Sequence, residues 1–354
     1  NNQERWERAY TANREAKQLL DQDGYGLYED FGQLFIEEGN RSVIFARLFS
    51  SQADRVHGWE QSVRPPAVQG GGSVNPTFEL VNAFPMENGL SIDNVASGYD
   101  STLFYKNRDP RFYETIAFNG ATWSFNGYPE DRRQWHYYVD GSTVEPSGGT
   151  NTGFYCRKAV DPSIPTEEIS ETGTDWVEIR YAEVLMNLAE TANATGRQQE
   201  AYNQLIAIRD RAGIDPGANS MYGLQPGMGR QQMVDAIMKE RQIEFAFENK
   251  RYWDLRRRNL FEEKLNGTSR HGLRINLKPE VSADDFRAAR DTISLDRAYE
   301  DYFEGELLTL DQDQLINYPQ PKYNFFAIPP EILQRSPEVE QTQGWDNGTF
   351  DPLQ

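Results

Sequence analysis

The fold is decided by the stretch Val177-Glu-Ile-Arg-Tyr-Ala-Glu-Val-Leu-Met-Asn-Leu-Ala-Glu-Thr-Ala192. Its apolar residues recur at intervals of three and four, which is the spacing of one face of an α-helix. Gly196 ends this helix, and a second apolar period from Ala201 to Ala212 stops at Gly213, where a C-terminal cap belongs. Two such helices joined by a short turn form an antiparallel pair that buries only one face, so the pair needs stacked neighbours.

The next segment, Ile237 to Arg256, continues the helical pattern and contains three regularly spaced glutamates. Glu240, Glu244 and Glu248 lie at i, i+4 and i+8, while Arg241 falls on the apolar face. A buried cation needs a carboxylate partner, so we expect Arg241 to bind Glu244, Glu248 or a carboxylate of another helix. The three glutamates favour an ion-pair network. A carboxylate-bridged metal site is the alternative, but no histidine accompanies them as in helical di-metal sites.

The composition excludes some classes of partner. The chain has 354 residues, with 55 acidic and 36 basic side chains and a net charge of −19. This balance argues against binding to nucleic acid or to an anionic membrane surface, because both need a basic patch. A single cysteine, Cys156, permits no internal disulfide, and we expect it to be a buried free thiol. No apolar run approaches the ~20 residues of a membrane-spanning helix.

Outside the two helical segments the sequence is irregular. A helix is expected at residues 5–20 and a short one from Ala283 to Arg290, whereas helical periodicity disappears between residues 25 and 172. Extended pieces are expected at Phe112 to Phe118 and Trp135 to Val139. Long irregular stretches in compact proteins often carry function.

Aromatic residues are frequent in this irregular middle, among amide and charged side chains. Sugar rings present apolar C–H faces that lie flat on indole and phenol rings, and rigid aromatic side chains lose little entropy on binding. If they bind a glycan, Trp123→Ala or Trp135→Ala should weaken affinity by about 1–3 kcal/mol without unfolding the chain. The alternative is that the rings pack loops onto helices. The candidate ligand-binding residues are Trp59, Tyr99, Trp123, Tyr128, Trp135 and Tyr138.

No pattern for catalysis or for a cofactor is present. The sequence has no nucleophile elbow, no phosphate-binding glycine loop and no zinc spacing. We therefore predict no catalytic residues, no metal ligands and no cofactor. Carboxylates are abundant enough for a glycosidase pair, but sequence alone does not give the distance between them.

Several segments carry the motifs of one protein family. They are Asp109-Pro-Arg-Phe112, Arg180-Tyr-Ala-Glu-Val-Leu-Met-Asn-Leu-Ala-Glu190, Ile208-Arg-Asp-Arg-Ala-Gly213, Lys239-Glu-Arg-Gln-Ile-Glu-Phe-Ala-Phe-Glu248 and Phe326-Ala-Ile-Pro-Pro-Glu-Ile332. Taken in order, they resemble SusD/RagB-type proteins, the outer-membrane glycan- or nutrient-capture lipoproteins of Bacteroidetes.

The resemblance implies a mainly α fold, in which a TPR-like helical-hairpin scaffold carries a large irregular domain with short β-hairpins. Residues 1–24 and 173–258 would form the scaffold, and residues 25–172 and 259–354 the irregular ligand-facing domain. Family members have a longer N-terminal portion, with a lipoprotein signal and the first helical repeats, to which nothing here corresponds. We therefore expect apolar surface left exposed on the scaffold.

The function implied by the resemblance is non-catalytic capture of oligo- or polysaccharides at the cell surface. The partner would be a SusC-type TonB-dependent transporter of the outer membrane, and the lipid anchor would sit on an N-terminal cysteine missing from this sequence. The alternatives are binding of a peptide or another nutrient, as in the RagB branch, a glycoside hydrolase, and a purely structural TPR-type adaptor.

Overall fold

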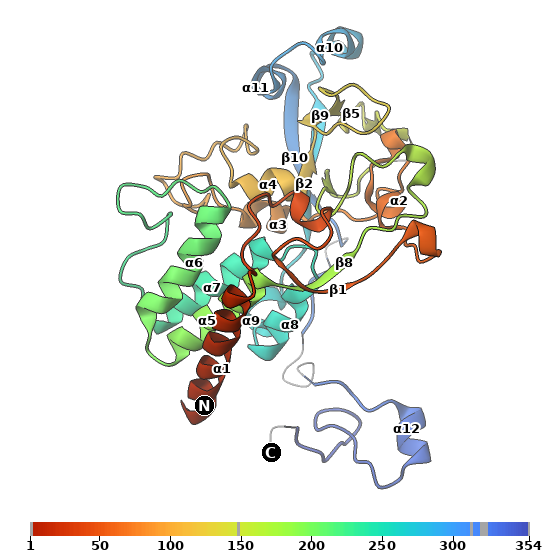
Figure 1. Ribbon diagram of the computed structural model, residues 1–354. Coiled ribbons are helices and arrows are strands. Elements are labelled where there is room, and N and C mark those ends of the chain that lie inside the picture. The colour runs from red at the N-terminus through yellow and green to blue at the C-terminus, as the bar shows by residue number, and fades with distance from the viewer. Residues whose placement is uncertain (1–2, 147–148, 312–313, 319–324, 353–354) are drawn as a thin grey trace. The chain divides into compact units, whose positions relative to one another are not determined.

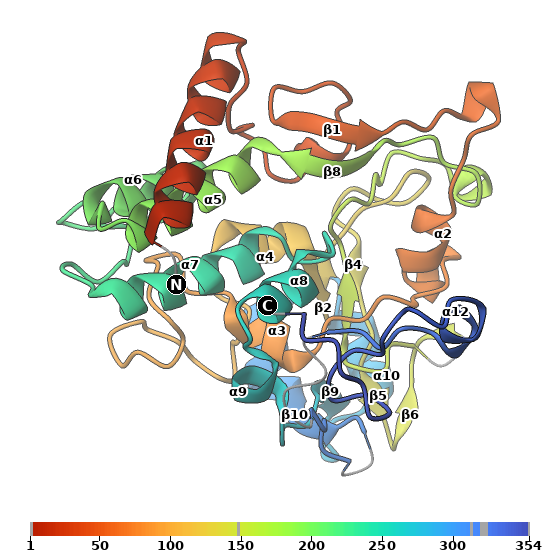
Figure 2. The same ribbon diagram turned by 90° about the horizontal axis from the view of Figure 1, so that it is seen from below.

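The computed structural model describes residues 3–146, 149–311, 314–318 and 325–352 (Figures 1 and 2). Helices hold 37% of the residues and strands 14%, which confirms the mainly helical prediction. The longer helices are α1 (Gln3–Gln22), α5 (Tyr181–Ala194), α6 (Gln198–Arg211) and α7 (Arg230–Glu244). The shorter ones are α2 (Trp59–Val63), α3 (Phe78–Ala83), α4 (Pro110–Thr115), α8 (Lys250–Arg257), α9 (Phe261–Leu265), α10 (Ala283–Ala289), α11 (Leu295–Arg297) and α12 (Pro330–Arg335).

Two compact units divide the chain. The first contains residues 1–248 and 271–308, and the second contains residues 249–270 and 309–354. Within the second unit, the rings of Phe261 and Tyr318 stack with centroids 4.8 Å apart. The proposed split into a scaffold and a ligand-facing domain concerns function, and it stays a prediction.

Helices α1, α5, α6 and α7 lie side by side in the first unit, with α5 in contact with the other three (Figures 1 and 2). The predicted antiparallel pair is α5 and α6. Gly196 and Gly213 both adopt positive φ, near +80° each, and end the two helices as expected. The predicted helices at residues 5–20 and 283–290 are confirmed by α1 and α10.

The strands form four small sheets. They are β1 (Val43–Arg47), β2 (Ile116–Phe118), β3 (Ala121–Thr122), β4 (Arg133–Gln134), β5 (Tyr138–Val139), β6 (Ser142–Thr143), β7 (Phe154–Cys156), β8 (Trp176–Arg180), β9 (His271–Leu277) and β10 (Phe303–Thr309). The largest sheet has the order β10-β9-β5-β6, and the pairs β1–β8, β2–β7 and β3–β4 make two-stranded sheets.

Two sequence expectations about local structure were wrong. The helix expected from Val177 begins only at Tyr181, because residues 176–180 pair with β1 in an antiparallel ladder, Arg47 opposite Trp176. The extended piece expected from Phe112 begins as helix α4 and becomes a strand only at Ile116. Asp109 caps that helix by accepting a hydrogen bond from the Arg111 amide, and Pro110 occupies its first turn, which is a recognised start signal.

The core of the first unit is rich in aromatic rings. One cluster joins α3, α4, β2, β9, α10 and β10, and contains Phe112, Phe118, Trp135 and Phe286. A second surrounds Trp123 and includes the thiol of Cys156, which is buried and free as predicted. Burial raises the pKa of that thiol to about 12.

Some apolar surface remains exposed, as expected. Leu19 on α1 and Ile179 on β8, both in the predicted scaffold, are 61% and 41% exposed, and Phe45, the cross-strand partner of Ile179 outside that scaffold, is 59% exposed. Among the described residues, no helix combines the length and the apolar character needed to cross a bilayer.

Candidate functional site

The three glutamates of the second helical segment anchor a buried ion-pair network. Glu240 and Glu244 lie on α7, and Glu248 lies in the turn that follows. Phe247 in that turn has φ of +63°, so the helix ends before Glu248, yet all three carboxylates are buried. The network brings together cationic side chains from parts of the chain that are far apart in sequence.

Arg111 of α4 binds two of these carboxylates at once. Its Nη1 lies 2.8 Å from Glu244 Oε2, and its Nη2 lies 2.7 Å from Glu240 Oε1. The same Nη2 is 2.7 Å from Asp109 Oδ2. Arg209 of α6 completes the surroundings of Glu240, with Nε 2.7 Å from Oε2. Helix α4, which lies in the irregular part of the sequence, is thereby held against α7.

Arg180, at the end of β8, bridges the other pair of carboxylates. Its Nη1 is 2.6 Å from Glu244 Oε1 and its Nε is 2.7 Å from Glu248 Oε2. Lys158 Nζ lies 2.6 Å from Glu248 Oε1, and Arg211 also binds Glu244. This network confirms the favoured interpretation of the three glutamates.

The electrostatics of Glu244 follow from these partners. Burial alone would raise the pKa of its carboxyl, but the charges of Arg211, Arg180 and Arg111 outweigh that effect and hold the pKa well below its usual range. Glu244 is therefore ionised, and its ligands are guanidinium groups. Among the described residues, no group of three or more His, Cys, Asp or Glu side chains is arranged to hold a metal ion.

Arg241 is 4% exposed, as predicted from its place on the apolar face. Its Nη1 donates to Asn187 Oδ1 at 3.2 Å, and its guanidinium carbon is 5.1 Å from the Phe245 ring centroid. Glu244 and Glu248, which we named as its partners, bind the cations described above. That a carboxylate binds Arg241 stays a prediction.

The network positions the walls of a cleft. Helix α4, fixed by Arg111, runs directly into β2, and Lys158 follows Arg157 at the end of β7. These segments border a cavity of about 420 Å³, within the range of about 300–1,000 Å³ typical of ligand pockets. The cleft is lined by Tyr105, Lys106, Asn107, Tyr113, Ile116, Phe118, Gly120, Ala121, Thr122, Arg133, Arg157 and Leu295.

One wall of the cleft is aromatic. The rings of Tyr105 and Phe118 stack with centroids 4.9 Å apart, and the Tyr105 hydroxyl donates to Asp296 Oδ1 at 2.7 Å. The Tyr113 hydroxyl accepts from the Arg108 amide at 3.1 Å and donates to the Tyr105 carbonyl at 2.7 Å. These bonds fix the tyrosine side chains, so that little conformational entropy is left to lose on binding.

The β3–β4 hairpin supplies the polar wall. Thr122 of β3 is paired with Arg133 of β4, and both line the cleft. Arg157 reaches the same hairpin, because its Nη1 donates to the Thr122 carbonyl at 3.0 Å. Hydrogen-bond donors thus line the same cavity as the half-buried Tyr113 ring and the Tyr105 and Phe118 rings, which are only 6% and 4% exposed.

Gly120 forms part of the cleft lining, and only glycine fits there. Its φ is +82°, and a Cβ would lie 2.4 Å from Leu295 Cδ1 and 2.9 Å from Trp135 Cζ3. The indole of Trp135 therefore lies directly beneath the cleft lining. Its Nε1 donates to Asp291 Oδ1 at 3.1 Å.

Trp123 and Trp135, two of the predicted ligand-binding residues, support the cleft and do not line it. They are 1% and 8% exposed. They belong to different core clusters, and Arg157 lies over the Trp123 ring at 5.8 Å. Their rings are largely packed against protein, so either alanine variant is expected to lose stability as well as affinity. A role in ligand binding stays a prediction for both.

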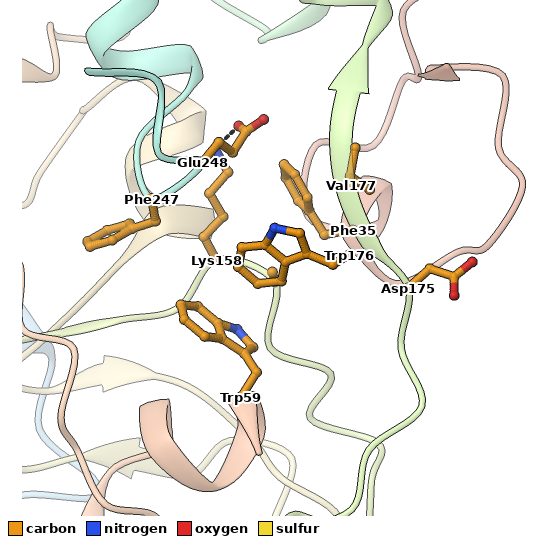
Figure 3. A pocket seen from close by; sticks show the side chains of 9 residues that line it. Phe35, Trp59, Lys158, Asp175, Trp176, Val177, Phe247 and Glu248 are labelled. Carbon is orange, nitrogen blue, oxygen red and sulfur yellow. Dashed lines mark hydrogen bonds and ion pairs between the residues drawn. The ribbon is translucent and has the colours of Figure 1, made fainter. Parts of the chain in front are cut away.

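Trp59 lines a smaller pocket, drawn in Figure 3, where its ring meets Trp176 edge to face at 5.2 Å. The Lys158–Glu248 ion pair borders the same pocket. Its volume is only about 20 Å³, enough for about one water molecule. The buried Trp59 Nε1 has no hydrogen-bond partner among the described residues, so a water is its natural acceptor. This pocket does not accommodate a sugar ring as it stands.

The three predicted tyrosines are half-buried and lie apart from the cleft lining. Each has an arginine over its ring: Arg108 at 5.7 Å from Tyr99, Arg132 at 4.0 Å from Tyr128, and Arg274 at 4.7 Å from Tyr138. The structure does not gather the six predicted aromatic residues into one surface.

The sequence interpretation missed most of the cleft lining. Tyr105, Lys106, Tyr113 and Arg157 belong to no recognisable motif, and only the fold brings them together. Arg133 is one of the charged side chains that stand among the loop aromatics in the sequence, two residues before Trp135. An arginine among closely spaced aromatic residues was the only feature of the sequence that could have indicated this part of the cleft.

Comparisons with known proteins agree with the fold. The profile of the SusD family matches residues 41–345. SusD-like protein P2 of Formosa agariphila is 34% identical over 94 residues, which are 26% of this chain and 19% of that protein. A SusD-like protein of Bacteroides fragilis superposes with a TM-score of 0.68 at 24% identity, covering 96% of this chain and 62% of that one.

A SusD-like carbohydrate binding protein of Bacteroides fragilis superposes with a TM-score of 0.62 at 24% identity, covering 79% of this chain and 53% of that one. The chain thus spans less than two thirds of the length of each of these relatives. At 24% identity the structural matches show the fold. The family profile covers most of the sequence from residue 41 onward, and the chain therefore belongs to the SusD family.

Proposed function

We propose that the chain captures a glycan without chemical conversion and that the glycan binds in the cleft between Tyr113 and Arg133. The observation that carries the proposal is the cleft itself: about 420 Å³, with fixed aromatic rings on one side and hydrogen-bond donors on the other. The SusD family is a family of non-catalytic binding proteins, and one structural relative is described as carbohydrate binding.

The proposed location of the site agrees with the proposed domain division. Cleft residues from Tyr105 to Arg157 fall in the segment 25–172, and Leu295 falls in 259–354, the two parts assigned to a ligand-facing domain. The helices of a TPR-like scaffold would then support the site through the ion pairs of Glu244 and Glu248. We also propose a surface location on the outer membrane through a lipid anchor, and delivery of the glycan to a SusC-type transporter, as the family resemblance implies.

A glycan array with the purified chain, followed by titration calorimetry of the bound glycans, tests the proposal. A reducing-sugar assay on the same glycans should detect no product. Release of sugars would support the glycoside hydrolase alternative, and binding of peptides in place of glycans would support the RagB alternative. Binding of neither class would favour a structural adaptor.

Filling the cleft should abolish binding. Thr122 is exposed on β3 and lines the cleft, so an indole in Thr122→Trp occupies the space of a sugar ring. We expect the dissociation constant to rise at least tenfold, about 1.4 kcal/mol, with an unchanged melting temperature. Ser142→Trp is the matched control, because Ser142 is exposed on β6 and does not line the cleft. Equal affinity of both variants and the wild type would place the site elsewhere.

A further inference from the structure

The charged side chains that line the cleft are all cationic. They are Lys106, Arg133 and Arg157, and the described lining contains no Asp or Glu. The chain as a whole carries a net charge of −19, so a cavity whose charged lining residues are all cationic is unusual for this sequence. Each cation comes from a different segment, and the fold brings the three together.

Arg133 is the cation most available to an anionic ligand, because its hydrogen-bond partners are neutral carbonyl groups and not a carboxylate. Its Nη1 donates to the carbonyl oxygens of Arg290 and Ile293 at 3.1 and 2.8 Å. In the described part of the chain it forms no ion pair, its Nε and Nη2 have no hydrogen-bond partner there, and its guanidinium carbon lies 5.8 Å from the Trp135 ring centroid. A guanidinium has five N–H donors, and Arg133 lines the cleft, so its remaining donors are available to a ligand.

Arg157 stands on the other side of Thr122. Its Nη1 holds the Thr122 carbonyl, and its Nε is 4.0 Å from Glu114 Oε2, a long and weak ion pair. Burial lowers the pKa of this guanidinium, which means that its charge is poorly solvated where it stands. Because Thr122 is the cross-strand partner of Arg133, the two arginines flank one residue of the lining.

Lys106 contributes less. Its ammonium group is bound by Asp296, which also accepts the Tyr105 hydroxyl. It is half-exposed and has further N–H donors beyond that ion pair. Asp296 pairs with Lys106 and Glu114 lies near Arg157, whereas Arg133 has no carboxylate partner among the described residues.

We propose that the glycan bound in the cleft is acidic, and that its carboxylate or sulfate group binds between Arg133 and Arg157. This inference rests on the proposed function and names the ligand class. Guanidinium groups bind carboxylate and sulfate oxygens with paired, charge-assisted hydrogen bonds, whereas a neutral sugar leaves the charge of Arg133 uncompensated.

Matched acidic and neutral glycans test the proposal. Tetragalacturonate and its full methyl ester share one backbone and differ in charge, and a sulfated galactan tetrasaccharide with its desulfated form provides the sulfate arm. We expect the acidic member of at least one pair to bind about tenfold tighter at low salt, and the advantage to shrink as salt rises. The pair in which the acidic member binds more tightly shows whether the acidic group of the ligand is a uronate or a sulfate ester.

Arg133→Gln should remove the preference, with about a tenfold loss of affinity for the acidic member and little change for the neutral one. Arg133→Lys should retain part of the preference for the acidic glycan, because lysine keeps the positive charge but lacks the paired N–H donors of the guanidinium. Arg287→Gln is the control, since Arg287 is exposed on α10 and pairs with Asp284 away from the cleft. Melting temperatures verify that all variants are folded.

The outcomes separate the two proposals. Equal or tighter binding of the neutral members, or an acidic preference that survives in Arg133→Gln, overturns the acidic-glycan inference and leaves glycan capture standing. Absence of binding to these four glycans and to every glycan of the array overturns the proposed function and the inference together.

Discussion

Replacing Glu244 with glutamine should lower the free energy of unfolding by about 3–5 kcal/mol. Glu244 is fully buried and binds Arg111, Arg180 and Arg211 at once. An amide has a similar shape but no charge, so Arg211 loses the carboxylate that it binds among the described residues, while Arg111 and Arg180 each lose one of several. Desolvated charges without a counter-ion are among the costliest defects in a folded protein.

Denaturant unfolding of the Glu244→Gln variant measures this loss. Asp235→Asn is the matched control, because it makes the same chemical change on the same helix at an exposed position that bonds only to Gln231 among the described residues. We expect the control to stay within about 0.5 kcal/mol of the wild type. A loss below about 1 kcal/mol in Glu244→Gln would contradict the account of the network.

The same variant should also change how the free energy of unfolding depends on pH in the acidic range. The pKa of Glu244 is depressed in the folded chain below its ordinary value of 4.5, so the folded state binds its proton less readily than the unfolded state. Its contribution to stability is therefore present above pH 4.5 and is lost as pH falls toward the folded pKa. The stability of Glu244→Gln should consequently fall less steeply than that of the wild type below this pH.

Truncating Trp123 to alanine should cost about 3–5 kcal/mol of stability. The ring is 1% exposed and packs among Phe125, Tyr155 and Val160, so its removal leaves a cavity in the core. The change also removes the ring beneath Arg157, and we expect weaker glycan binding as a consequence.

Thermal unfolding and titration of Trp123→Ala separate the two effects. Phe45→Ala is the control, because Phe45 is a large aromatic residue that is 59% exposed on β1, and its loss should cost less than about 1 kcal/mol. If Trp123→Ala keeps the wild-type melting temperature and loses only affinity, the ring binds the ligand directly. That outcome would contradict the structural role that its burial indicates.

The helices of the scaffold could be predicted from the sequence, because α1, α5, α6 and α7 each have a local helical periodicity of apolar residues. Local patterns do not show pairing between distant segments. Val177 fits a helical stripe and still lies in β8, because its ladder partner strand ends at Arg47, far earlier in the chain. The glutamates of the network were visible at i, i+4 and i+8, but Arg111 lies 133 residues from Glu244.

The candidate site was the least predictable part for the same reason. Residue type identified Trp123 and Trp135 as large aromatic groups in a loop-rich region, but whether a ring faces solvent or core is decided by what packs against it. The lining residues Tyr113 and Arg157 come to the same cleft only because ion pairs hold their segments in place. Arg111 fixes α4 to α7, and Lys158 fixes the end of β7 to Glu248. No local pattern contains that information.

A crystal structure of the chain with the glycan that it binds most tightly would show directly where the ligand lies. We expect a sugar ring in the cleft beside Tyr113, with an oxygen of the glycan within hydrogen-bond distance of the Arg133 guanidinium. A sugar bound on Tyr128 or Tyr138, with no glycan between Tyr113 and Arg133, would contradict it.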